Sequence, residues 1–547
     1  MSNKTRPFFT KLFMLLFGGS VIFGCANRQL PQGGPRDHDP PKLLKATPPN
    51  MTRNFKGKEI RLDFDEFFKL NNPYQEITMS PTPAKPPEYN VRQKGIQIVL
   101  KDSLEKNTTY VINFGKSIAD VNEGNVLKNF TYVFSTGPHI DSLSISGSVI
   151  NNQTQEKEKE VTVMLFNLKQ DSLLFGKKKP TIFASTDSAG NFTLSNLHAD
   201  DYRIYALKET SPNKIYDNDN ELIAFSKNPI HLTRDTSNVQ LRLFRQTPQK
   251  FRLVDRRFDG DGKMFFTFNQ KLDNPSLLIT YPTGFDKQKI VELSKTNDTA
   301  TLYMRNMDFD SLRMVFLDNN KPLDTIAMKK GRKEGFARFL TFQYNINRND
   351  LLKPGTDVVV KTSLPIETFD QSLISLKEDS AEVTNFTIQK DTANTRLFTI
   401  KYRWKQVVNY TLTIGEGAFT DIYGDKNKRS LKRFKIDKPE NYSTLNLVVT
   451  VPDSSKSFIV ELLNEQSSVL RSDVIRKKTT LHYRNYLAAK YRVRVVYDDN
   501  RNGKWDSGDV KRKIQPENIW ADETIITLRP NWDQDTPIAI PRESTIP

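Results

Sequence analysis

A stretch near the end of the chain, residues 498–509, carries oxygen-bearing side chains at the spacing of a calcium-binding loop. The candidate metal ligands are Asp498, Asn500, Asn502, Asp506 and Asp509, at positions one, three, five, nine and twelve. Gly503 stands at position six, where a tight bend lets alternate side chains face one hard cation. The spacing therefore predicts a structural calcium ion.

The loop resembles EF-hand-like loops carried on β scaffolds, although Asp509 replaces the longer bidentate glutamate and a predicted strand precedes it. A metal-free hairpin tip stays open as an alternative, with Asn502-Gly503 making the turn and the aspartates bonding to nearby backbone. An aligned copy has Lys214 in place of the glycine, so we expect a cation there less than in the later loop. Its polar residues are Glu209, Ser211, Asn213, Asp217 and Asn220.

The only cysteine, Cys25, follows an apolar stretch that begins at Leu12, with Lys4, Arg6 and Lys11 before that stretch. This order is typical of a secretory signal peptide over residues 1–24. Ile22-Phe23-Gly24-Cys25 resembles the bacterial lipobox, which implies covalent diacylglycerol and acyl lipid such as palmitate on Cys25. The alternative is an ordinary signal peptide followed by a chance cysteine. Residues 25–39 are predicted to form a flexible tether, because they are rich in proline, glycine and charge.

Apolar and polar residues alternate along most of the chain, which predicts an all-β protein. Residues 40–137 contain such strands, for example Ile60-Arg61-Leu62-Asp63-Phe64 and Thr109–Phe114, followed by Ala119-Asp120 and Gly124-Asn125. In this order they resemble a bacterial Ig-like domain of the S-layer-protein type. Residues 141–245 contain the turn Asp187–Phe192 and then Asp201–Ile204, and resemble prealbumin-like domains of the Cna-B or carboxypeptidase-regulatory type.

Both patterns occur again later in the chain. Residues 351–440 repeat the Ig-like series through Tyr410, Asp421 and Gly424, and residues 441–541 repeat the prealbumin-like series from Tyr491. Residues 246–350 are predicted to form a further Ig-like sandwich. The expected fold is thus a series of Ig-like and prealbumin-like β-sandwiches after a lipoprotein signal peptide.

The formal net charge of +17 falls to +14 without the three basic residues of the signal. Such a charge favours anionic partners, and we expect an outer-membrane protein or an anionic surface polysaccharide. Nucleic acid is excluded by export and by the scattered distribution of the charge. The oligomeric state is not predicted.

The five histidines have no metal-binding spacing, and no nucleophile or phosphate motif is present. We therefore expect a non-catalytic lipoprotein, a scaffold or adhesion protein anchored to the surface or the periplasmic face of the outer membrane. The resemblances suggest a bacterium of the Bacteroidota type. A glycan-handling surface hydrolase or substrate-binding subunit with an unrecognised carboxylate site is the alternative.

Overall fold

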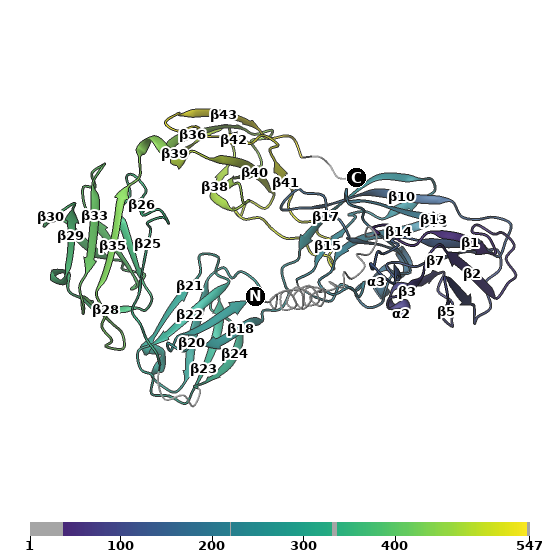
Figure 1. Cartoon of the computed structure of the whole chain (residues 1–547), viewed down its shortest axis with the longest axis horizontal. Coiled ribbons are helices and arrows are strands. Elements are labelled where there is room, and N and C mark those ends of the chain that lie inside the picture. Colours follow the sequence, from purple (N-terminus) through teal and green to yellow (C-terminus); the bar gives the residue numbers. More distant parts are fainter. Residues whose placement is uncertain (1–36, 219, 331–335, 544–547) are drawn as a thin grey trace, which may run out of the picture. The chain divides into compact units, whose positions relative to one another are not determined.

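The computed structural model describes residues 37–218, 220–330 and 336–543 (Figure 1). The predicted signal peptide, Cys25 and most of the predicted tether lie outside the described residues. The described residues up to Ser142 form one compact unit, and those from Leu143 onward form a second. Strands dominate both, with a few short helices, so the all-β prediction is confirmed.

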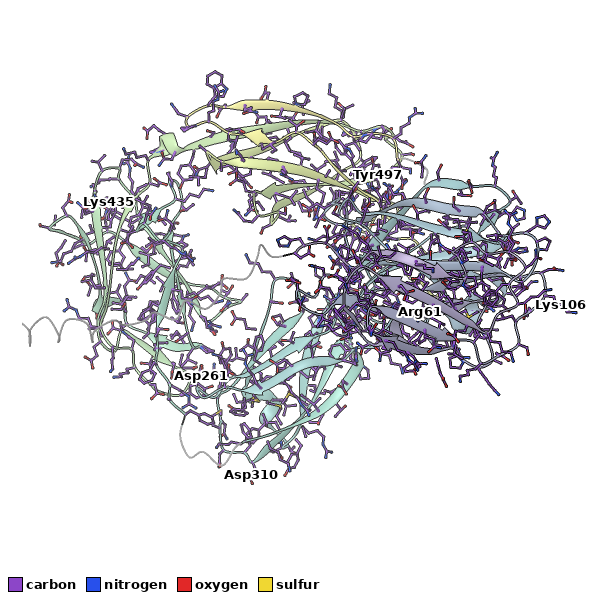
Figure 2. All side chains as sticks on the ribbon, turned by 45° about the vertical axis from the view of Figure 1, so that its right-hand side comes forward. Arg61, Lys106, Asp261, Asp310, Lys435 and Tyr497 are labelled. Atoms are coloured by element: carbon purple, nitrogen blue, oxygen red, sulfur yellow. The ribbon has the colours of Figure 1, made fainter. Side chains whose placement is uncertain are left out.

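The first unit holds module one, residues 43–135. A sheet of order β1-β2-β6-β5 and a sheet of order β4-β7-β9 enclose its core, and β3 pairs with β8. Alternation buries Ile60, Leu62 and Phe64 and leaves Arg61 exposed. Figure 2 labels Arg61 in this strand and Lys106 in the turn before β7. The elements are β1 Leu43–Thr47, β2 Glu59–Phe64, β3 Phe68–Leu70, α2 Pro73–Glu76, β4 Thr78–Ser80, β5 Glu88–Arg92, β6 Gly95–Val99, β7 Thr109–Asn113, β8 Ile118–Asp120 and β9 Thr131–Ser135.

Module two, residues 143–245, is built on strands in the order β12-β11-β14-β15-β17-β10-β13, with β16 paired to β14. Its core contains Ile145, Val163, Ile204 and Leu243, all fully or almost fully buried. The elements are β10 Leu143–Asn151, β11 Thr162–Asn167, α3 Leu168–Leu174, β12 Ile182–Ser185, β13 Asn191–Leu197, β14 Asp200–Lys208, β15 Leu222–Phe225, β16 Ile230–Leu232 and β17 Thr236–Arg245.

Module three, residues 253–329, has two sheets, β18-β19-β22-β21 and β20-β23-β24, around a core that includes Phe266, Leu302 and Phe316. The elements are β18 Leu253–Phe258, β19 Met264–Phe268, β20 Pro275–Tyr281, η1 Phe285–Gln288, β21 Lys289–Leu293, β22 Thr299–Met304, β23 Ser311–Asp318 and β24 Lys321–Lys329.

Module four, residues 342–436, begins earlier than residue 351. Phe342–Tyr344 pairs with Val358–Thr362 and so belongs to this module, which corrects the boundary expected at residues 350 and 351. The elements are β25 Phe342–Tyr344, β26 Leu351–Leu352, β27 Val358–Thr362, β28 Ile366–Phe369, η2 Gln371–Leu373, β29 Ile374–Glu378, β30 Ala381–Val383, β31 Thr387–Lys390, β32 Leu397–Lys401, β33 Asn409–Ile414, β34 Phe419–Asp421 and β35 Ser430–Ile436.

Module five, residues 442–539, follows the turn η3 Pro439–Asn441. The sheet β39-β36-β43 covers the sheet β38-β37-β40-β41, with β42 paired to β40. Leu447, Val460 and Val495 are fully buried between the sheets. The elements are β36 Tyr442–Thr450, β37 Ser457–Asn464, β38 Val469–Ile475, β39 Thr479–Leu487, β40 Lys490–Asp498, β41 Ile519–Ala521, β42 Ile526–Thr527 and β43 Gln534–Ala539.

Candidate metal-binding loop

The predicted calcium loop connects two neighbouring strands of module five. It leaves at the end of β40 and returns at β41, and these strands are antiparallel, with Val496 opposite Ile519. The N–H of Tyr497 donates to the carbonyl oxygen of Asn518 over 3.0 Å. The ladder therefore fixes both ends of the loop and places Asp498 across from Glu517.

Asp498 is the anchor of the loop, and it is 1% exposed. Its carboxylate accepts the backbone N–H of Asn502 at 3.0 Å and of Gly503 at 3.2 Å, and the hydroxyl of Ser457 at 2.8 Å. Gly503 has φ of 74°, the left-handed region in which glycine carries no Cβ penalty. The structure thus forms the bend that the sequence predicts at position six.

Asn500, Asn502 and Asp506 meet on the open side of the loop. The side-chain amide of Asn502 donates to Asp506 Oδ2 over 2.7 Å, and the amide of Asn500 donates to the same oxygen. Asn502 Oδ1 accepts the N–H of Lys504 at 2.8 Å. Four of the five predicted ligands are therefore joined in one network around the bend.

Asp509 is bonded elsewhere. Its Oδ1 accepts the N–H groups of Lys511 and Arg512 at 2.9 and 3.0 Å. Backbone hydrogen bonds in both directions between Asp509 and Ile514 close a second, separate turn. Asp509, the twelfth position of the predicted loop, thus lies in an additional turn. The connection from β40 to β41 is longer than twelve residues, and this turn belongs to its second half.

Glu517, and not Asp509, is the later carboxylate that is bonded to this loop. Its two carboxylate oxygens accept the N–H groups of Asp499 and Asp506, each at 3.0 Å. Burial, together with the charges of Asp506 and Asp498, raises the pKa of Glu517 to about 7. A comparison of the two modules could have found Glu517 in the sequence. Glu517 lies two residues before β41, and Glu221 of module two lies directly before β15.

The oxygen-only donor set of the loop suits a hard cation such as calcium. Among the described residues, however, no three histidine, cysteine, aspartate or glutamate side chains are grouped so as to hold a metal ion. The loop as described is closed by hydrogen bonds from the two asparagine amides to Asp506. A cation would have to replace these bonds with its own contacts to the same oxygens.

The distal part of the loop packs against module two, within the same compact unit. The Lys513 ammonium lies 3.3 Å from a carboxylate oxygen of Asp171, and the N–H of Val510 donates over 2.9 Å to Oε1 of Gln246, the residue directly after module two. The carbonyl oxygen of Glu517 accepts the amide of Asn152 at 3.0 Å. Glu517 thus closes the loop with its side chain and contacts module two with its backbone.

A groove of about 1840 Å³ runs beside this contact and is bordered by both modules. Basic and acidic side chains both line it, including Arg234 and Lys227 of module two, Asp499 and Asp506 of module five, and Arg542, which follows module five. A mixed charged lining of this kind suits a polar macromolecule more than an apolar small ligand.

The other predicted site residue, Cys25, lies outside the described residues, so its lipid stays a prediction. No helix in the described part of the chain has both the length and the apolar character needed to cross a bilayer.

Comparison with known proteins identifies the first module. A family model described as a bacterial Ig-like domain matches residues 37–136, which confirms the resemblance of that module. The match covers less than half of the chain. No curated protein matches the sequence significantly.

Solved structures give weak likenesses only. The Bacillus anthracis TIE protein is 9% identical, with 93% of this chain and 76% of that chain covered and a TM-score of 0.15. The major pilin subunit BcpA of Bacillus cereus is 10% identical, with 73% and 99% covered and a TM-score of 0.14. A Bacteroides ovatus protein from a mixed-linkage glucan utilization locus, SGBP-B, is 11% identical, with 63% and 85% covered and a TM-score of 0.17. Scores this low leave the functional argument to the chain itself.

Proposed function

We propose that this chain is a lipid-anchored, non-catalytic scaffold or binding protein of the bacterial outer membrane. The observation that carries this proposal is a series of β-sandwich modules whose interiors are filled by their own side chains, the first of them a bacterial Ig-like domain. Sandwiches filled in this way present surfaces and spacing rather than enclosed pockets.

The anchor in this proposal is Cys25. Its lipid would hold the mature chain firmly only with more than one acyl chain, because each buried CH₂ contributes about 0.8 kcal/mol and one chain is marginal. The predicted tether then keeps the modules close to one surface, which raises their effective concentration toward neighbours there.

The partner in this proposal is an outer-membrane protein or an anionic surface polysaccharide. The mature charge of +14, taken from the sequence without its signal, speeds the encounter with acidic partners. Because exposed charges are screened over about 8 Å at physiological ionic strength, the association should weaken as salt rises.

Calcium belongs to the proposal as a structural ion of module five. Asp498, Asn500, Asn502 and Asp506 would hold it together with Glu517, and the cation would offset the mutual repulsion of these carboxylates. A carboxyl group with a pKa near 7 is also what a general acid needs. However, both Glu517 oxygens are bonded to loop N–H groups, which favours a role in holding the loop.

A membrane pull-down from the native host tests the main proposal. Mature chain on the membrane should recover an outer-membrane protein or surface polysaccharide, with recovery falling as salt rises. The Cys25→Ala variant should leave the membrane fraction and lose labelling by a palmitate analogue. An empty pull-down, together with glycan hydrolysis that a single Asp or Glu substitution abolishes, would replace the scaffold with the hydrolase alternative.

Thermal unfolding of the full mature chain tests the calcium site. Calcium should raise the transition of module five, because a ligand that binds only the folded state stabilises it by RT ln(1 + [L]/Kd). Asp498→Asn with Asp506→Asn should remove this effect. A transition that ignores both calcium and a chelator would support the metal-free turn.

A further inference from the structure

Strand β5 of module one forms an open edge of its sheet. It lies at the end of the order β1-β2-β6-β5, and among the described strands it pairs with β6 alone. Val91 in this strand is 40% exposed, and Tyr74, whose ring meets that of Tyr89 edge-on, is 71% exposed. Such an edge offers unpaired backbone N–H and C=O groups to another strand.

The hydrogen bonds of β6 show which residues of β5 present these groups. The N–H of Leu100, directly after β6, donates over 2.8 Å to the carbonyl oxygen of the residue directly before β2. Because the direction of these groups alternates along a strand, Gln97 faces β5, where it lies opposite Asn90. The residues on either side, Tyr89 and Val91, therefore direct their N–H and C=O groups away from the sheet.

The sequence of β5, Glu88-Tyr89-Asn90-Val91-Arg92, is complementary to itself in the antiparallel direction. When two copies of the strand pair about Asn90, Glu88 of each copy lies opposite Arg92 of the other, and such pairs of opposite charge stabilise a sheet. Tyr89 lies opposite Val91 of the other copy, so the outward N–H and C=O groups of these two residues exchange hydrogen bonds.

The chain on either side of β5 selects this register. Pro86-Pro87 precedes the strand and cannot extend the ladder, and the turn Gln93-Lys94 follows it. Only a pairing centred on Asn90 therefore uses the whole strand. A centre at Tyr89 or at Val91 would shorten the paired segment and separate the opposite charges.

We propose that two copies of this chain pair through β5, antiparallel and centred on Asn90, in a dimer with two-fold symmetry. The opposite charges at equal distances from Asn90 are the observation that points to a second copy, because a two-fold axis repeats each contact of one half in the other. A strand of this length covers little surface, so the dimer exchanges readily with the monomer. The pairing goes beyond the proposed function and needs neither the lipid nor the membrane.

Single-cysteine cross-linking of the full mature chain tests the register. Cys25 is the only cysteine, so Cys25→Ala gives a background without thiols. Asn90→Cys then places two thiols opposite each other, in a pair without mutual backbone hydrogen bonds, where side chains lie closest. Mild oxidation should link this variant at least about tenfold faster than Arg61→Cys, because pairing raises the local thiol concentration. Arg61 is the matched control, since it is exposed in the same cross-strand row, two strands from the edge.

Exchange of the charges tests the two ion pairs. Glu88→Arg and Arg92→Glu are each added to the Asn90→Cys chain. Either variant alone places like charges opposite each other, so its rate of linking should fall at least about tenfold. An equal mixture of the two variants restores both ion pairs, and it should link as a mixed dimer at close to the original rate. Mass spectrometry identifies the mixed dimer, and circular dichroism checks that each variant keeps its strand content.

The outcomes separate this pairing from the proposed function. The proposal is overturned if Asn90→Cys links no faster than Arg61→Cys, which is also the result expected if a strand of another protein occupies this edge. It is overturned as well if the mixture links no faster than either charge variant alone. The membrane pull-down does not depend on these results, so an empty pull-down together with linking at Asn90 would reject the proposed function and leave the dimer.

Discussion

Modules one and four contain the same aspartate turn, and the turn is bonded differently in each. Asp120 ends β8 and Asp421 ends β34, and both are 1% exposed. Asp120 accepts three backbone N–H groups, from Glu123, Gly124 and Asn125, at 2.6, 2.9 and 2.7 Å. Asp421 accepts two, from Tyr423 and Asp425, both through Oδ1, and its Oδ2 has no partner among the described residues.

The difference in donors decides how each buried carboxyl titrates. Burial by itself would raise the pKa of Asp120, but the three N–H groups outweigh burial and lower that pKa. In module four burial prevails, and with the nearby charge of Asp425 it raises the pKa of Asp421. Two copies of one motif therefore differ in whether the charge stabilises the fold.

The two turns also contact different neighbours. The Asn125 amide donates to the carbonyl oxygen of Asp37, at the start of the described chain. In module four the Arg338 guanidinium lies 3.6 Å from the ring centre of Tyr423, and its Nε donates to the carbonyl oxygen of Asp261 in module three. The turn of module one thus binds the segment that precedes the module, and the turn of module four connects modules three and four through Arg338. Contacts of this kind suit a scaffold.

The largest expected effect is that of Asp120→Asn. The amide keeps one acceptor oxygen but directs an NH₂ group at a backbone N–H, leaving a buried donor without a partner. Hydrogen-exchange mass spectrometry on the full chain should show protection in residues 118–135 falling by roughly ten- to a hundredfold. Unchanged protection would mean that the three hydrogen bonds do not stabilise module one.

Acid should remove the same contribution from the unsubstituted chain. A carboxyl whose folded pKa is lowered stabilises the fold above its unfolded pKa of about 3.9, and this stabilisation is lost as pH falls through the folded value. The difference in exchange between the unsubstituted chain and Asp120→Asn should therefore narrow below about pH 4. A difference that stays constant down to pH 2 would contradict the lowered pKa.

Tyrosine hydroxyls give a second, smaller contrast between these modules. Tyr110 accepts the N–H of Glu105 at 2.8 Å, and Tyr410 accepts the N–H of Lys405 at 2.6 Å. Tyr410 also donates to Glu378 over 3.3 Å. Tyr410→Phe should cost module four about 1–2 kcal/mol, and Tyr110→Phe should cost module one about 1 kcal/mol. Urea unfolding followed by module-specific exchange measures both, and equal costs would show that the Glu378 contact adds nothing.

The sequence predicted these repeated features well because they are local. The alternation at Ile60, Leu62 and Phe64 is confirmed as a strand with a buried face, and the bend at Asn502-Gly503 forms as expected. Glu517 was missed because its partnership with Asp498 depends on how β40 and β41 pair, which ligand spacing along the chain does not encode.

The boundary near residue 350 was misplaced for a related reason. Phe342–Tyr344 alternates like a strand of any module, and only its pairing with β27 assigns it to module four. The number of N–H groups bonded to the carboxylate, three at Asp120 and two at Asp421, could not be predicted from the sequence either, since the two turns share an aspartate and a glycine. It depends on which N–H groups the shorter turn of module four directs at the carboxylate.

Asp421→Asn should have the smallest effect and the opposite pH dependence. The amide keeps Oδ1 for the N–H groups of Tyr423 and Asp425 and removes a charge that burial and Asp425 disfavour, while losing the attraction of Arg338. At neutral pH, module four should change by no more than about 0.5 kcal/mol in its free energy of unfolding, toward greater stability.

Because the folded pKa of Asp421 is raised, protonation favours the folded state. The unsubstituted module should therefore gain stability relative to the variant as pH falls from neutral through that folded pKa, and exchange measured on both chains across this range checks it. A loss comparable to that of Asp120→Asn would show that both turns rely on a charged carboxylate, and the contrast between the two modules would fail.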